Sequence, residues 1–364
     1  MLFTSASELR FYFPTHAIDT LDPFMGVIDN SEHDFLQEKL GTPLYNRLCD
    51  WYNEDGHGGI DSAIEPDDKN DYYTRLLLLC QRSVAYDAFS RAIEFGIVSP
   101  NNGGINVPTS DDYGKVDLAA IEKFRQRCIT EAHAAINRLL QTLEDWCQEL
   151  SENQENPENP STPGTTSELQ EIVTLWQQSR YFYLAAGMLI PSARVLQEYL
   201  NIYDSREKFI QMLPDLRFLQ EEILAPAIGE DLCAYLVKCS VHGDSIDEEY
   251  KPIVAQVLRK ARKYLAAALE NRTLVLKTDK LRRQQAHDEA VRLLASLQQY
   301  IADHQDIFPE TAIKTSPLYT PPPSEEGHTP SSDGSPVCCC TTAAQDEYNN
   351  NRRDSALFAT PFLN

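Results

Sequence analysis

Apolar residues recur every three or four positions along most of the chain, which is the spacing of an amphipathic helix. The longest stripe steps through Ile121, Phe124, Cys128, Ala132, Ala135, Leu139, Leu143 and Trp146. The same spacing predicts helices over residues 72–93, 249–270 and 281–301. Two segments, GGINV (103–107) and TLVL (273–276), predict a short hairpin or turn instead. The fold class that follows is all-α.

Two stretches interrupt the helical pattern. Residues 151–167 are rich in Pro, Asn, Ser and Glu, and the stretch from 312 onward has the same character. Such compositions bury too little apolar surface to order themselves. We therefore predict a helical domain over 1–150, a linker over 151–167, a second helical domain over 168–311 and a disordered tail over 312–364. Capping-box patterns at 165–168 and 245–248 mark two expected helix starts in the second half.

The two halves share a pattern that indicates an internal repeat. The tetrapeptide FLQE occurs twice, at 35–38 and 218–221, but aligning the chain on it leaves the glycines behind it out of register. Aligning Gly41 with Gly229 instead pairs the apolar positions without a gap, among them Leu40 with Ile228, Leu44 with Leu232 and Leu48 with Leu236. Upstream, RFYF (10–13) resembles RYFY (180–183). The prediction is two divergent copies of one helical module; the alternative is that two amphipathic halves align by chance.

Charge is spread unevenly along the chain. The net charge is −23, and residues 1–164 hold 12 Lys and Arg against 28 Asp and Glu. An acidic chain repels phosphate, so nucleic acid is an improbable partner. No apolar run is long enough to span a membrane, and the first residues lack the pattern of a signal peptide. Cysteines scattered in apolar helices are typical of a reducing compartment. We therefore expect a cytoplasmic protein.

The sequence contains no strong catalytic or cofactor motif, so we predict neither an enzyme nor a cofactor. The acidic segment 55–71, which includes His57, lacks the ligand spacing of a calcium loop. Cys233, Cys239 and His242 fit no zinc pattern, and the adjacent Cys338, Cys339 and Cys340 cannot easily surround one ion. No metal site is predicted. The aromatic cluster at Trp176 and 181–183 is expected to pack in the core.

A basic stretch in the second half is the strongest candidate for an interface. Residues 251–283 contain ten Lys and Arg against Glu270 and Asp279. We select seven as candidate partner-interface residues: Lys251, Arg259, Lys260, Arg262, Lys263, Arg282 and Arg283. An acidic first half and a basic stretch in the second favour head-to-tail self-association. The alternatives are a solvated helix face and, less compatible with the total charge, a nucleic-acid contact.

One pattern resembles a known group of proteins. A long apolar helix, an acidic or glutamine position (Glu32, Gln220) and then LGTPLYNRL (40–48) or IGEDLCAYL (228–236) is similar to an uncharacterised helical family of Bacteroidetes phages and prophage-like elements. The segment 179–236 resembles it most. Small helical proteins of this kind resemble phage head–tail connectors, or neck adaptors, which form rings. The resemblance thus implies a ring-forming role with other virion or prophage proteins, in the cytoplasm of a bacterial host or in a virion. It carries no catalytic residues.

The expected function is therefore a non-enzymatic structural or assembly protein, of the head–tail connector or neck-adaptor type, forming a ring through helical interfaces. The alternative function is a bacterial scaffold or regulatory protein that binds a partner through its C-terminal tail.

Overall fold

The computed structural model describes residues 1–12, 20–54, 71–94, 99–101, 104–106, 118–155, 165–184, 187–241, 246, 248–274 and 280–321. These residues are almost entirely helical, which confirms the all-α class, and they form two compact units. The first comprises Met1–Ala185 together with Ser205–Glu207, and the second Ala186–Asp204 together with Lys208–Asn364.

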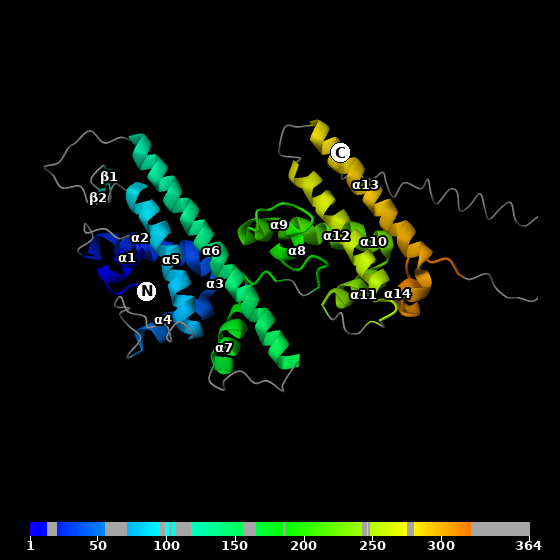
Figure 1. Ribbon diagram of the computed structural model, residues 1–364, viewed down its shortest axis with the longest axis horizontal. Coiled ribbons are helices and arrows are strands. Elements are labelled where there is room, and N and C mark those ends of the chain that lie inside the picture. Colours follow the sequence, from blue (N-terminus) through cyan, green and yellow to red (C-terminus); the bar gives the residue numbers. More distant parts are fainter. Residues whose placement is uncertain are drawn as a thin grey trace, which may run out of the picture. The chain divides into compact units, whose positions relative to one another are not determined.

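The first unit is built around two long helices, α5 and α6, which lie side by side (Figure 1). Its elements are α1 (Ala6–Tyr12), a 3-10 turn (Asp22–Phe24), α2 (Met25–Asn30), a π-helical turn (Ser31–Leu36), α3 (Gln37–Leu40), α4 (Thr42–Asn53), α5 (Tyr72–Glu94), β1 (Ser99–Asn101), β2 (Gly104–Asn106), α6 (Leu118–Glu155) and α7 (Thr165–Gln177). Helix α7 packs against α4, α5 and α6, and buries Trp176 completely.

The second unit also has two long helices side by side, α12 and α13 (Figure 1). Its elements are α8 (Ala193–Gln197), α9 (Arg206–Phe218), a π-helical turn (Leu219–Leu224), α10 (Ala225–Ile228), α11 (Glu230–Val241), α12 (Lys251–Leu274), α13 (Lys280–Asp303), a 3-10 turn (Gln305–Ile307) and α14 (Glu310–Ile313). The first two residues of α9, Arg206 and Glu207, are grouped with the first unit.

The internal repeat is visible in the element boundaries. Each unit places a six-residue π-helical turn, a four-residue helix, a glycine and a twelve-residue helix in direct succession, at 31–53 and at 219–241. Both stretches have the same length, so the register set by Gly41 and Gly229 continues through all four elements without a gap. Upstream, Leu2 and Leu189 correspond, because each is fully buried and donates its backbone N–H to the second residue of its unit's π-helical turn, Glu32 or Gln220. In that register RFYF follows Leu2 whereas RYFY precedes Leu189, so the two tetrapeptides do not correspond.

In each unit a glycine separates the four-residue helix from the twelve-residue helix, and this position is the glycine joint. Glycine is required there because another chain segment lies against it. Gly41 and Gly229 both have positive φ, 83° and 104°, which a side chain disfavours. A Cβ on Gly41 would lie 2.0 Å from Ser179 Oγ, and one on Gly229 would lie 2.8 Å from Ser316 Cα. Each serine follows the last helix of its own unit, and its oxygen accepts a hydrogen bond from the backbone two residues on. The two glycine–serine contacts are thus equivalent.

Several sequence-based boundaries need correction. Residues 312–321, expected in a disordered tail, belong to the fold: Ala312 and Ile313 end α14 and Ser316 is buried. The remainder of that tail, 322–364, lies outside the described residues. Of the expected linker, residues 151–155 form the end of α6 and 165–167 the start of α7. The rest of the linker, and residues 275–276 of TLVL, also lie outside the described residues.

The hairpin expected at GGINV is present, because β2 pairs antiparallel with β1. The capping box at Thr165 coincides with the first residue of α7. Helix α12 begins at Lys251, and Ser245 lies outside the described residues. The second compact unit begins at Ala186, later than the expected 168, since α7 buries its apolar face in the first unit. No described helix is long and apolar enough to cross a membrane.

Candidate functional site

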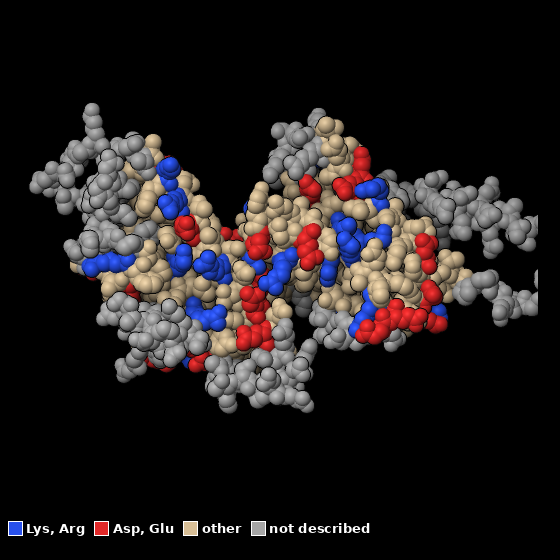
Figure 2. All heavy atoms as spheres, viewed as in Figure 1, with Lys and Arg blue, Asp and Glu red and all other residues tan. Residues whose placement is uncertain are grey.

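The basic residues selected from the sequence do not form one continuous free surface. Arg259 and Lys263 are exposed, one turn apart on α12. Lys260 is partly covered, with its Nζ donating to Ser296 Oγ at 2.8 Å. Lys251 forms an ion pair with Glu248 at 2.6 Å. On the face drawn in Figure 2, Lys and Arg side chains gather over the middle of the second unit, between Asp and Glu side chains.

Arg262 has a structural role that the sequence did not reveal. Its Nε donates to the Leu189 carbonyl at 2.8 Å and one terminal nitrogen donates to Ser240 Oγ at 2.6 Å. In the first unit Gln81 Nε2 donates to the Leu2 carbonyl at 2.6 Å, which is the equivalent contact. Arg262 therefore fixes the start of its own unit. Arg283 is half-buried near the start of α13, and the side chain of Arg282 lies outside the described residues.

The described cysteines have the environment of structural thiols. Burial raises the pKa of Cys128 and of Cys233 to about 11, and the pKa of Cys239 is raised by the same cause. A thiol with such a pKa is protonated at neutral pH and is a poor nucleophile and a poor metal ligand. Among the described residues, no three His, Cys, Asp or Glu side chains are grouped so as to hold a metal ion. His57, His242 and Cys338 to Cys340 lie outside those residues.

A group of titratable side chains lies in the first unit, where α4, α5 and α7 meet. Arg47 Nε donates to Glu171 at 2.9 Å, and the Tyr73 hydroxyl donates to the other oxygen of the same carboxylate at 2.8 Å. The Arg47 guanidinium also lies over the Tyr73 ring, which stacks on Trp51. Burial acts to raise the pKa of Glu171, but these two hydrogen bonds outweigh it and lower the pKa. Each oxygen of the Glu171 carboxylate thus accepts a hydrogen bond.

Beside it, two carboxyl groups face each other. Asp71 caps α5 by accepting from the backbone and hydroxyl of Thr74, at 3.0 and 2.7 Å. Burial, and then the adjacent Asp71, raise the pKa of Glu168 to about 7. Burial also acts to raise the pKa of Asp71, but the hydrogen bonds from Glu168 and Thr74 outweigh it and lower the pKa. The pair therefore takes up one proton as the pH falls through about 7, and Glu168 is the group whose pKa is raised.

The first unit also contains a buried ion pair that joins distant parts of the chain. Arg206 is fully buried, and both its Nε and a terminal nitrogen lie 3.2 Å from Glu144 Oε2. The other Glu144 oxygen accepts from the Tyr183 hydroxyl at 2.7 Å. The Arg206 backbone N–H donates to Asn137 Oδ1 at 2.8 Å. No short motif links these residues, so the sequence offered no signal for the cluster. Tyr183 and Trp176, by contrast, are core residues as predicted.

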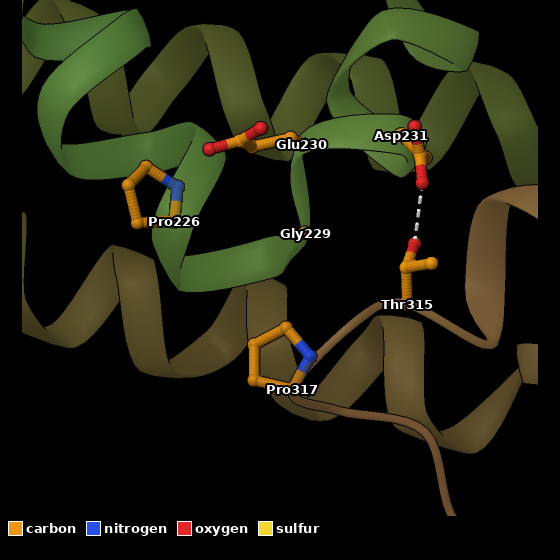
Figure 3. A pocket seen from close by; sticks show the side chains of 6 residues that line it. All are labelled: Pro226, Gly229, Glu230, Asp231, Thr315 and Pro317. Carbon is orange, nitrogen blue, oxygen red and sulfur yellow. Dashed lines mark hydrogen bonds between the residues drawn. The ribbon is translucent and has the colours of Figure 1, made fainter.

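The second unit has an open pocket of about 360 Å³ at the glycine joint (Figure 3). It is lined by Pro226, Gly229, Glu230, Asp231, Thr315 and Pro317. Asp231 accepts a hydrogen bond from Thr315 Oγ1 at 2.8 Å, whereas Glu230 extends away from this pair. The pocket thus brings one hydroxyl and one carboxylate together.

Fold and side chains together define an all-α protein with two repeated helical units. Residues 36–184 match the model of a family described as Family of unknown function (DUF6712). The match covers less than half of the chain and lies inside the first unit, from the end of its π-helical turn to the segment that covers Gly41. No curated protein and no solved structure matched the chain. The family description contains no phage or connector term.

Proposed function

We propose that this protein is a non-enzymatic assembly protein whose copies associate head to tail, as in a ring of the phage connector or neck-adaptor type. The contact would join the acidic first unit of one copy to the basic face of α12 in the next. A contact between two different surfaces repeats from copy to copy and closes into a ring when the rotation allows.

The observation that carries this proposal is the charge placed on one exposed helix face. Arg259 and Lys263 are exposed and one turn apart on α12, in a chain whose net charge is −23. Four other basic residues of the stretch have local partners: Lys251 with Glu248, Lys260 with Ser296, Arg262 with Leu189 and Arg272 with Asp215. Opposite charges across an interface accelerate encounter and fix orientation, and their effect weakens as salt rises.

The test is the mass of the full chain in solution, measured by sedimentation at low and at high salt. Self-association should be present at low salt and weaken as salt rises. The double variant Arg259→Glu/Lys263→Glu should weaken it about tenfold or more, equivalent to ~1.4 kcal/mol.

The matched control is Arg127→Glu/Lys238→Glu, which makes the same change in net charge at two exposed residues on α6 and α11. This control should associate like the original protein, apart from a small effect of total charge. A monomer at every salt concentration would reject the proposal, and so would an equal loss in both double variants.

A further inference from the structure

In each unit, one residue of the π-helical turn holds the first residues of the unit in place by a hydrogen bond. In the first unit Glu32 Oε1 accepts from the Leu2 backbone N–H at 2.7 Å, and in the second Gln220 Oε1 accepts from the Leu189 N–H at 2.8 Å. Glu32 and Gln220 are each the second residue of their turn, and Leu2 and Leu189 are fully buried. The carbonyls of the same leucines are held by Gln81 and Arg262. In both units, the backbone N–H and carbonyl of one buried leucine are thus held by two side chains. This pair of hydrogen bonds is called the fastening of the unit.

The two fastenings differ in one chemical respect. Gln220 is an amide, so it accepts through Oε1 and donates through Nε2 to the Gly187 carbonyl at 2.8 Å. Glu32 is a carboxyl, and its second oxygen lies 2.6 Å from the Tyr45 hydroxyl. When Glu32 is ionised, both oxygens accept. When it is protonated, one oxygen accepts from Leu2 and the other donates to the Tyr45 oxygen, because a hydroxyl both donates and accepts. The protonated carboxyl then has the same donor–acceptor pattern as Gln220.

We propose that Glu32 is a proton-sensitive fastening, which holds residues Met1–Tyr12 on the first unit more tightly when it is protonated, whereas Gln220 fastens the second unit independently of pH. The physical basis is burial: Glu32 is 1% exposed, and a buried carboxylate is costly to keep ionised. A buried carboxylic acid, like a buried amide, has no such cost once its hydrogen bonds are made.

The charged and titratable groups around Glu32 act in both directions. Burial is the largest influence and raises the pKa of Glu32, and Asp29 on α2 raises it further. The hydrogen bonds from Tyr45 on α4 and from Leu2, and the amino group of Met1 at 3.8 Å, lower the pKa but do not reverse the shift. The thiols facing this region, Cys49 on α4 and Cys80 on α5, themselves have raised pKa values through burial and remain neutral.

Because the pKa of Glu32 is raised, protonation strengthens the fastening of the first unit. A carboxyl that binds its proton more tightly in the fastened state than in the free state stabilises the fastened state as the pH falls. The first segment should therefore be held less firmly at alkaline pH and more firmly at mildly acidic pH. This is opposite to the behaviour of a salt-bridged carboxylate, whose contribution is lost in acid.

The test is hydrogen–deuterium exchange of the full chain, followed in peptides that cover residues 1–12 and 187–197. Protection factors, corrected for the intrinsic pH dependence of exchange, should rise several-fold between pH 8 and pH 5.5 for the first peptide. They should not change for the second. In Glu32→Gln the first peptide should be protected at both pH values, because the amide has the donor–acceptor pattern of the protonated acid.

The reciprocal variant Gln220→Glu should make the protection of the second unit's first residues depend on pH. It places a carboxyl opposite the Gly187 carbonyl, so residues 187–197 should become less protected at pH 8 and recover at pH 5.5. Circular dichroism provides the check that both variants remain helical. The proposal is overturned if the protection of residues 1–12 does not change with pH, or if the change is the same in Glu32→Gln. These outcomes do not depend on self-association, which the sedimentation experiment tests separately.

Discussion

A methyl group added to Gly41 would meet Ser179, and one added to Gly229 would meet the backbone of Ser316. Both glycines also have positive φ. We expect Gly41→Ala and Gly229→Ala each to lower the free energy of unfolding of its own unit by about 1–3 kcal/mol. The control is Gly26→Ala, because Gly26 lies in α2 with nothing within 4 Å of an added Cβ. Alanine there should be neutral, or stabilise by up to about 1 kcal/mol.

The chain allows the effects on the two units to be measured separately. Its three tryptophans, Trp51, Trp146 and Trp176, all belong to the first unit. Tryptophan fluorescence during urea unfolding therefore follows the first unit, and far-UV circular dichroism follows both. Gly41→Ala should shift the fluorescence transition and Gly229→Ala should leave it in place. Equal shifts in both variants would show that the units unfold as one cooperative block.

The glycines also show how far single residues could be interpreted from the sequence. Gly41 and Gly229 were recognisable as helix-ending glycines, since an apolar run precedes each and leucines follow. The serines that make glycine obligatory could not be recognised from the sequence. Ser179 and Ser316 are far from the two glycines in the chain, and the residues beside one serine differ from those beside the other. Arg206 is a further example. Its burial depends on Glu144, 62 residues away, and no local pattern distinguishes it from an exposed arginine.

At the scale of elements, the junction of α5 and α7 should respond to pH. Burial, and then Asp71, raise the pKa of Glu168 to about 7, so the folded state takes up a proton that the unfolded state does not hold at that pH. The contribution of this pair to stability therefore rises as pH falls from 8 to 6. Glu168→Gln should raise the midpoint of thermal unfolding at pH 8 and reduce its pH dependence between 6 and 8. Glu171→Gln serves as the comparison.

Glu171→Gln should behave in the opposite way, since it removes a carboxylate that Arg47 and Tyr73 hold ionised. It should lower the unfolding midpoint at pH 8, by an amount reduced through solvent screening because the group is partly exposed. If Glu168→Gln also lowers the midpoint at pH 8, its surroundings stabilise the Glu168 carboxylate there, and the raised pKa of Glu168 is contradicted.

Helices were the part of the fold that the sequence predicted best, because their apolar stripes are long. The expected helices at 72–93 and 281–301 agree with α5 and α13 to within two residues at each end. The π-helical turns were not predicted. Their six residues continue an apolar pattern that a normal helix would also satisfy. The tail was predicted to begin too early, since short apolar segments such as 312–313 have no periodicity of their own.

At the scale of the molecule, the first unit depends on three residues that come from beyond its main segment. Ser205–Glu207 are grouped with it, and Arg206 is fully buried against Glu144. Arg206→Ala would leave a buried carboxylate without its counter-ion, so we expect it to destabilise the first unit by about 3–5 kcal/mol. The fluorescence transition in urea provides the measurement.

Combining Arg206→Met with Glu144→Gln should restore much of the loss caused by either change alone, because no buried charge remains. Strictly additive losses in the double variant would mean that the two side chains do not interact. Lys208→Ala, a change at an exposed neighbour two residues along, should leave the fluorescence transition unaltered.

The connection that follows the repeated stretch differs in length between the units. Eighteen residues separate α4 from α5, but nine separate α11 from α12, although the helices on either side correspond. Doubling the length of a connection costs only about 0.6 kcal/mol in closure entropy. The shorter connection, after Val241, is therefore a natural place to insert an epitope or a short labelling peptide, which would report on this protein inside an assembly without occupying the exposed face of α12.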